Sequence, residues 1–67
     1  MRINYNLKVE DLNMSKRTTD ALINNNIRYL ADLRNITQED MIHWRNFGTM
    51  SKRELIHKLR EFKIEII

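Results

Sequence analysis

The stretch Trp44-Arg45-Asn46-Phe47-Gly48-Thr49-Met50-Ser51 contains the only glycine of a 67-residue chain that has no proline. It separates two segments with helical spacing of apolar residues, and Thr49 and Ser51 are residue types that cap helices. Because glycine adopts positive φ and lets another backbone approach, we expect a tight turn between two helices at Gly48. The amides opening the second helix would then be unpaired and able to hold a phosphate. For Gly48 alone, a plain helix-ending turn is the simpler interpretation.

Composition limits the chain to one small domain without a disulfide or a thiolate metal site. Its 67 residues are near the lower limit for folding without a cross-link such as a disulfide or a structural metal, and it contains no cysteine. His43 and His57 are too few and too far apart for a metal cluster, and both are expected at the surface or half-buried. The lone Trp44 is expected to pack in the core rather than to stack on a base. With 12 Lys and Arg against 9 acidic residues, the net charge is +3, which permits DNA, RNA or acidic-protein partners without requiring one.

Several classes of function are not supported by the sequence. The start of the chain has no long apolar run of the kind found in signal peptides and membrane spans, so we expect a cytoplasmic protein, or a domain cut from one. There is no cysteine nucleophile, no glycine-rich phosphate loop with a lysine, and no carboxylate pair in a pocket. We therefore expect neither an enzyme nor a cofactor nor a small-molecule substrate.

Residues 1–8 are interpreted as an extended arm or linker end, followed by a helical domain over 9–67. Apolar residues alternate loosely at the start of the chain, but a single strand without a partner is not stable. We therefore expect this region to be extended, with Leu12 and Met14 packing onto the helices.

Three short helices are predicted in the middle of the chain. Ser15 is a good N-cap for a helix over 16–24, which a run of three asparagines ends. Apolar residues at three-residue spacing indicate a second helix over 29–34. Thr37 begins a third helix, with Asp40 completing an acidic capping box. The residues expected to form its buried face are Met41, Ile42 and Trp44.

The longest helix is predicted over 50–62. Its apolar residues form one stripe on a 3.6-residue period: Leu55, Ile56, Leu59 and Phe62. Its other face is basic, which most often means a solvated face: Lys52, Arg53, Lys58 and Arg60. Isoleucines at 64, 66 and 67 are expected to fold back over the core. Together the segments predict an all-α fold, a compact bundle of four to five short helices preceded by the extended arm.

Two segments, VEDLNMSKRTTDALINNNIRYLADL over 9–33 and RNFGTMSKRELI over 45–56, have a recognisable order of motifs. They contain an acidic pair before a leucine, a serine two residues before an arginine, and an Ile-x-Tyr-Leu-x-Asp-Leu helix. An Asn-Phe-Gly turn and a Ser-x-x-Glu helix follow. In this order and spacing, the chain from Val9 to Ile66 resembles the C-terminal domain of the α subunit of bacterial RNA polymerase. The resemblance implies a compact helical domain with a helix-hairpin-helix element.

The resemblance also implies a non-catalytic domain that contacts phosphates and the minor groove of A·T-rich promoter DNA, and that meets σ and transcription activators. The arginine that enters the groove falls on Arg17, and a narrow A-tract groove favours a guanidinium. The phosphate-binding turn falls on Gly48, Ser51 and Glu54. There the Ser51 hydroxyl and amide would donate to phosphate, and Glu54 would cap its own helix or orient basic groups. The residues expected to contact DNA are Arg17, Asp20, Ala21, Gly48, Met50, Ser51, Lys52 and Glu54.

Two positions depart from the family pattern, which usually has asparagine where this chain has Asp20 and lysine where it has Met50. Asp20 lies one turn after Arg17, where it is expected to pair with Arg17 and to repel phosphate. Met50 removes a cation, which lowers the slope of the salt dependence by about 0.9. Basic residues of neighbouring turns can compensate: Lys16, Lys52 and Arg53. An alternative hypothesis is therefore a protein-interaction module of the same fold that has lost DNA binding.

The resemblance implies two protein-facing surfaces as well. Asp11 matches an acidic position that faces σ, although Asn13 replaces an acid beside it. Thr37, Gln38 and Glu39 match an activator-facing patch in position and partly in type. The sequence identifies neither the protein partner nor the oligomeric state, and it does not distinguish a free-standing protein from an excised domain.

Overall fold

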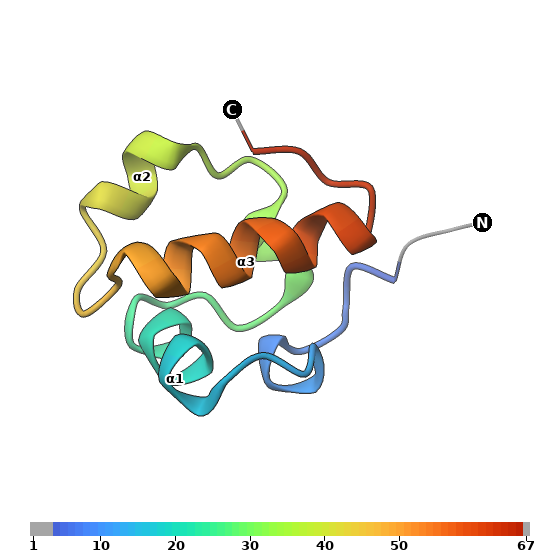
Figure 1. Cartoon of the computed structure of the whole chain (residues 1–67). Helices are drawn as coiled ribbons and strands as arrows, with labels where there is room; N and C mark the ends of the chain where they lie inside the picture. Colours follow the sequence, from blue (N-terminus) through green and yellow to red (C-terminus); the bar gives the residue numbers. More distant parts are fainter. Residues whose placement is uncertain (1–3, 67) are drawn as a thin grey trace.

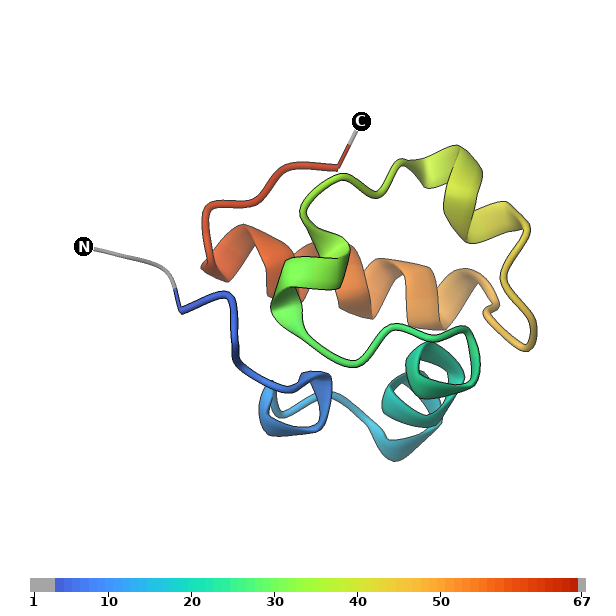
Figure 2. The same ribbon diagram turned by 180° about the vertical axis from the view of Figure 1, so that it is seen from behind.

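The longest helix lies at the centre of the computed structural model, which describes residues 4–66, and the other elements are arranged around it (Figure 1). The helical elements in chain order are the 3-10 helix η1 (Val9–Asp11), α1 (Lys16–Asn24), the 3-10 helix η2 (Leu30–Leu33), α2 (Gln38–Ile42) and α3 (Thr49–Glu61). Seen from behind, η2 lies beside α3 (Figure 2). The predicted all-α class is confirmed, and residues 4–66 form no strand, only an isolated bridge between Lys8 and Tyr29.

Side-chain caps begin α1 and α2 where the sequence predicts them. The Ser15 hydroxyl accepts a hydrogen bond from the Thr18 amide at 3.3 Å, so α1 starts at Lys16. In α2, the Asp40 amide donates to the Thr37 hydroxyl at 3.2 Å and the Thr37 amide donates to the Asp40 carboxylate at 2.9 Å. This reciprocal capping box satisfies two amides that the helix itself leaves unpaired.

The core is built mainly from leucines on α1, η2 and α3. Its fully covered side chains, with at most 1% exposed, include Val9, Leu22, Leu30, Leu33, Met41, Leu55 and Leu59. Ile56 and Phe62 are half-buried against it, so the predicted stripe of α3 is confirmed. Trp44 also packs on the core and meets Phe47 edge-to-face, with ring centroids 5.0 Å apart. Ile64 is buried and Ile66 is half-buried against the core, whereas the predicted contact of residue 67 lies outside the described residues.

Three local predictions need correction. The segment over 29–34 is a 3-10 helix rather than an α-helix, with the Asp32 amide donating to the Tyr29 carbonyl at 2.9 Å. Ile42 is 73% exposed, because the five-residue α2 presents only one narrow face to the core and Met41 fills it. The expected positive φ at Gly48 is wrong, since its φ is −86°.

The turn before α3 obtains its left-handed residue from an asparagine instead. Asn46 has φ 54°, a region that asparagine tolerates better than most residues. A Cβ built on Gly48 would meet no atom of the described residues within 4 Å, so the space on that side of the glycine is open. Gly48 is therefore exposed at the surface of the turn.

The first described residues run along η2 instead of projecting from the domain. The Leu30 amide donates to the Leu7 carbonyl at 2.8 Å, and the Ala31 amide donates to the Tyr5 carbonyl at 2.9 Å. The predicted packing of Leu12 and Met14 onto the helices is confirmed, with Leu12 only 3% exposed. The division of the chain at residue 8 stays a prediction.

Candidate nucleic-acid interface

A hollow of about 560 Å³ lies between α1 and the start of α3. Its α1 side is formed by Arg17, Asp20, Ala21 and Asn24, and its other side by Asn46, Gly48, Thr49, Met50 and Ser51. The hollow therefore brings together every residue predicted to contact DNA except Lys52 and Glu54. We call it the α1–α3 hollow.

The start of α3 presents unpaired backbone amides to the α1–α3 hollow. Gly48 is the N-cap and has no side chain with which to accept a hydrogen bond. The first backbone bond of the helix runs from the Lys52 amide to the Gly48 carbonyl at 3.0 Å. Within residues 4–66, the amides of Thr49, Met50 and Ser51 have no acceptor. They form the positive end of the α3 dipole, where an anion is favoured.

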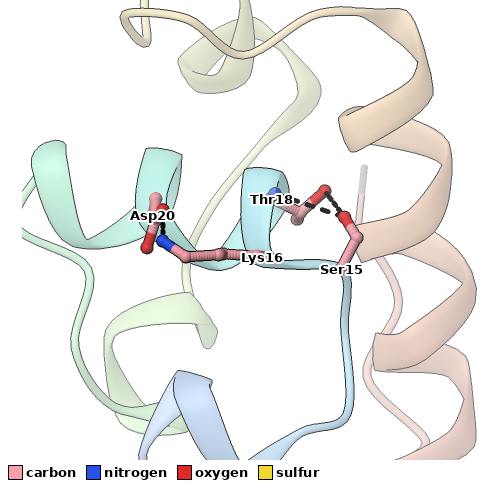
Figure 3. A network of polar contacts seen from close by, with 4 residues as sticks. All are labelled: Ser15, Lys16, Thr18 and Asp20. Carbon is pink, nitrogen blue, oxygen red and sulfur yellow. Dashed lines mark hydrogen bonds and ion pairs between the residues drawn. The ribbon is translucent and has the colours of Figure 1, made fainter.

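Arg17 projects from the first turn of α1 as an exposed residue. The predicted pair of Arg17 with Asp20 is wrong, because the Asp20 carboxylate pairs with Lys16 Nζ at 2.8 Å (Figure 3). Lysine and aspartate at i and i+4 lie on one face of the helix, so they meet readily. The hydrogen bond to Asp20 also holds the pKa of Lys16 above its ordinary value. Among the described residues, the Arg17 guanidinium has no ion-pair partner.

Glu54 is placed differently from the prediction. It was expected to cap its own helix near Ser51 or to orient basic groups. Its carboxylate instead crosses to the start of α1, so the predicted cap is wrong, and the orienting role stays a prediction. The Ser15 amide donates to one carboxylate oxygen at 2.7 Å, and the hydroxyls of Ser15 and Thr18 donate to the other. The Thr18 hydroxyl above all, then Ser15 and the Lys58 charge, lower the pKa of the Glu54 carboxyl below its ordinary value, although burial opposes the shift.

The hydroxyl of Ser51 belongs to the same set of contacts. Ser51 is only 4% exposed, and its hydroxyl lies 3.1 Å from that of Thr18, which is itself 1% exposed. Figure 3 shows Ser15 and Thr18 on the side of α1 that faces α3. Sequence reasoning missed Thr18, because a buried threonine on α1 has no spacing relation to a serine and a glutamate 33 and 36 residues away. A role of the Ser51 hydroxyl in binding phosphate stays a prediction.

The residues predicted to face other proteins lie outside the α1–α3 hollow. Asp11 ends η1 and Asn13 follows it with φ 60°, and both are exposed. The patch over 37–39 is exposed at the start of α2. The two surfaces therefore occupy different elements, and their roles stay predictions.

The described residues contain neither a metal-binding cluster nor a membrane-spanning helix. No group of three or more His, Cys, Asp or Glu within residues 4–66 is arranged to hold a metal ion. None of the helices formed by these residues has both the length and the apolar composition needed to cross a membrane.

A sequence model of the family described as the C-terminal domain of the bacterial RNA polymerase alpha subunit matches residues 1–61. This protein belongs to that family. The predicted resemblance is thereby confirmed, and the α C-terminal domain is a non-catalytic domain of RNA polymerase. The match covers α1, α2 and α3, and with them the whole α1–α3 hollow.

Curated relatives agree with the family match. The α subunit of DNA-directed RNA polymerase from Mycoplasmopsis pulmonis is 29% identical over 62 residues, which are 92% of this chain and 19% of that subunit. The α subunits of Rickettsia akari and Rickettsia prowazekii are each 37% identical over 57 residues, 85% of this chain and 17% of theirs. This α C-terminal domain therefore spans less than a fifth of the length of these relatives.

Proposed function

We propose that this α C-terminal domain binds A·T-rich promoter DNA through the α1–α3 hollow, contacting phosphates and the minor groove, and also docks transcription factors. The observation that supports the proposal is that an unpaired Arg17 and the free amides of α3 border one hollow. A phosphate at those amides would satisfy donors that the fold leaves unpaired. On this proposal, α2, the turn that follows it and α3 act as a helix-hairpin-helix element.

Charge and shape favour weak and salt-sensitive binding. The protein has a net charge of only +3, and one acidic residue, Asp20, borders the hollow. Its pair with Lys16 offsets part of the repulsion between the carboxylate and a phosphate, and the pair leaves Arg17 available. A guanidinium in the narrow minor groove of an A-tract gains from the concentrated negative potential there.

Binding of a fluorescently labelled A-tract duplex, measured by anisotropy at two salt concentrations, tests the proposal. We expect Arg17→Ala to weaken binding about tenfold, or ~1.4 kcal/mol, and to lower the salt slope by about 0.9. Arg60→Ala is the matched control, because this exposed arginine lies in the last turn of α3, outside the hollow. Trp44 fluorescence verifies folding. The proposal would be contradicted if the wild-type affinity is the same at both salt concentrations. It would also be contradicted if Arg17→Ala binds the duplex as well as the wild type.

A second candidate function is a protein-docking domain that has lost DNA binding. The observation in its favour is that both Asp20 and the 73% exposed Met50 line the hollow. A carboxylate and an apolar side chain favour a protein surface over a polyanion. The double change Asp20→Asn with Met50→Lys distinguishes the two functions. A strong increase in DNA binding after the double change would support an otherwise intact DNA surface. If the protein binds no DNA either before or after the change, the result supports protein docking.

A further inference from the structure

The exposed side of α3 carries a row of basic side chains. Between Ser51 and Arg60, the exposed residues are Arg53, His57 and Arg60, and the other residues of this range are buried or half-buried. Spacings of four and three residues place the three side chains on one face of the helix. Over this row the helix rises about 10 Å. We call the row the α3 stripe.

One side of α3 is left uncovered by the other elements of the described residues. In Figure 1 no segment of residues 4–66 passes in front of α3, whereas η2 lies behind it, and Figure 2 shows the same order from the other side. Leu55 and Leu59 of α3 lie in one core cluster with Leu30 and Leu33 of η2. The exposed residues of α3 therefore lie on the side of the helix that faces away from η2.

The carboxylates of α3 do not neutralise the α3 stripe. Glu54 is hydrogen-bonded to the start of α1, and Glu61 pairs with Lys58 at 3.3 Å. Among the described residues, neither Arg53 nor Arg60 forms an ion pair. The stripe therefore keeps a positive charge that a negatively charged partner can complement.

Ile56 gives the α3 stripe an apolar edge. It lies three residues after Arg53 and four residues before Arg60, so it sits between the two arginines on the helix surface. Its side chain is half-buried against the core. A partner that reaches both arginines would also cover the accessible part of this isoleucine, and burial of apolar surface is not screened by salt as an exposed charge pair is.

We propose that the α3 stripe docks an acidic amphipathic helix of another protein, with carboxylates at Arg53 and Arg60 and an apolar side chain against Ile56. The inference deepens the docking part of the proposed function, and it is separate from DNA binding by the α1–α3 hollow. A second helix suits the stripe because its residues at i, i+4 and i+7 repeat the same spacing. An extended segment covers 10 Å with about three residues, so few of its side chains would face the stripe.

The geometry of α3 argues against DNA as the partner of the stripe. Backbone amides point towards the N-terminus of a helix, so a phosphate bound at the start of α3 lies beyond that end. Arg60 follows Thr49 by three turns of the helix, or about 16 Å along its axis. Because exposed charges are screened over about 8 Å at physiological salt, Arg60 gains little from such a phosphate. With DNA in the hollow, Arg60 stays free for a protein.

The test is an NMR titration of the isotopically labelled protein with a synthetic helical peptide at low salt. The peptide carries glutamates at i, i+4 and i+7 and a leucine at i+3 between them. We expect the largest changes in amide shift over residues 53–60. A peptide of the same composition, with its glutamates spread around the helix, should bind about fivefold more weakly, because it cannot place its carboxylates on one face.

Charge reversal at Arg60 tests the α3 stripe directly. Arg60→Glu should weaken binding of the peptide about tenfold. Arg28→Glu is the matched control, because it changes the net charge equally at an exposed arginine that precedes η2, and it should bind the peptide within about twofold of the wild type. Of two peptides that each replace one outer glutamate with lysine, one should bind Arg60→Glu better than the parent peptide does. Trp44 fluorescence verifies the fold of each variant.

Four results with the peptides would overturn the inference. They are no binding at low salt, shift changes that centre outside residues 53–60, equal binding of the two arrangements of glutamates, and equal effects of Arg60→Glu and Arg28→Glu. A fifth concerns DNA: if Arg60→Glu loses more affinity for the A-tract duplex than Arg28→Glu does, the stripe belongs to the DNA surface instead.

The two proposals fail in distinguishable ways. Each of these five results leaves DNA binding by the α1–α3 hollow standing if Arg17→Ala still loses the duplex. A folded wild-type protein that binds no duplex, but docks the peptide through the α3 stripe, would overturn the DNA-binding part of the proposed function and leave the inference in place.

Discussion

The Glu54 carboxylate accepts hydrogen bonds from one amide and two hydroxyls, so the fold stabilises its charged form. These bonds lower its pKa in the folded state relative to the unfolded state. A group whose pKa falls on folding adds stability above its unfolded pKa, about 4.3 for glutamate. That stability is lost as the pH falls through the lower folded value. At the level of single residues, one side chain that joins α1 to α3 thus makes the stability of the fold depend on pH.

The resulting prediction concerns acid stability. Between about pH 6 and about pH 3, wild-type stability against urea should fall more than that of Glu54→Gln, by about 1 kcal/mol, the typical size of an N-cap interaction. Glu39→Gln is the control, because it removes an exposed carboxylate on α2 and leaves the contacts of Glu54 intact. Equal loss of stability in the wild type and Glu54→Gln would contradict the assignment.

Among the elements, α3 belongs both to the core and to the candidate site. Leu55 and Leu59, one turn apart, are both 0% exposed, and they belong to one core cluster with the leucines of α1 and η2. The same helix presents its N-terminal amides to the α1–α3 hollow. Packing and the candidate site therefore depend on one rigid element, which fixes the direction of the amides relative to the core.

Truncation of Leu55 tests this dependence. Leu55→Ala should lower the free energy of unfolding by about 2–5 kcal/mol, because it removes transfer energy and leaves a cavity. For a domain of this size, that is a large part of the total stability. Ile42→Ala on α2, at 73% exposure, should change it by less than about 0.5 kcal/mol. Circular dichroism during urea unfolding measures both, and similar losses for the two variants would show that the core is assigned wrongly.

On the scale of the whole molecule, residues 5–9 close the domain over η2. Carbonyls of this segment accept from the amides of Leu30 and Ala31, and the Val9 amide donates to the Arg28 carbonyl at 2.9 Å. Tyr5 packs against the core, and the Arg34 guanidinium carbon lies 4.3 Å from the centroid of its ring. The radius of gyration is 10.8 Å. Because so small a domain buries a limited share of its surface, each segment that covers apolar side chains adds to its stability.

We therefore expect Tyr5→Ala to destabilise the domain by about 1 kcal/mol, through lost packing and a lost cation–π contact. Tyr5→Phe keeps the ring under Arg34 and should stay within about 0.5 kcal/mol of the wild type. Thermal unfolding followed by circular dichroism measures the difference. If both variants melt with the wild type, the first described residues do not contribute to the fold.

Local rules of sequence account for the helix boundaries and the core. Ser15 and Thr37 cap helices as predicted, and Leu55 and Leu59 are buried as their spacing indicates. Each of these outcomes depends on residues within about one helical turn, whose geometry is set by the backbone period. The motifs around Arg17 and Gly48 likewise predicted most residues of the hollow, because they follow the motif order of the family.

Only the tertiary structure decided which partner each polar group takes. One expectation for Glu54 was a cap within its own helix, yet it bonds to residues 36 and 39 positions earlier. The choice depends on how α1 and α3 pack, which brings the hydroxyls of Ser15 and Thr18 beside a carboxylate that a helical pattern leaves free. Gly48 took an ordinary φ for a related reason, because Asn46 supplies the left-handed residue that reverses the backbone. Spacing along the sequence determines which residues share a helix face, but the packing of the faces determines which side chains meet.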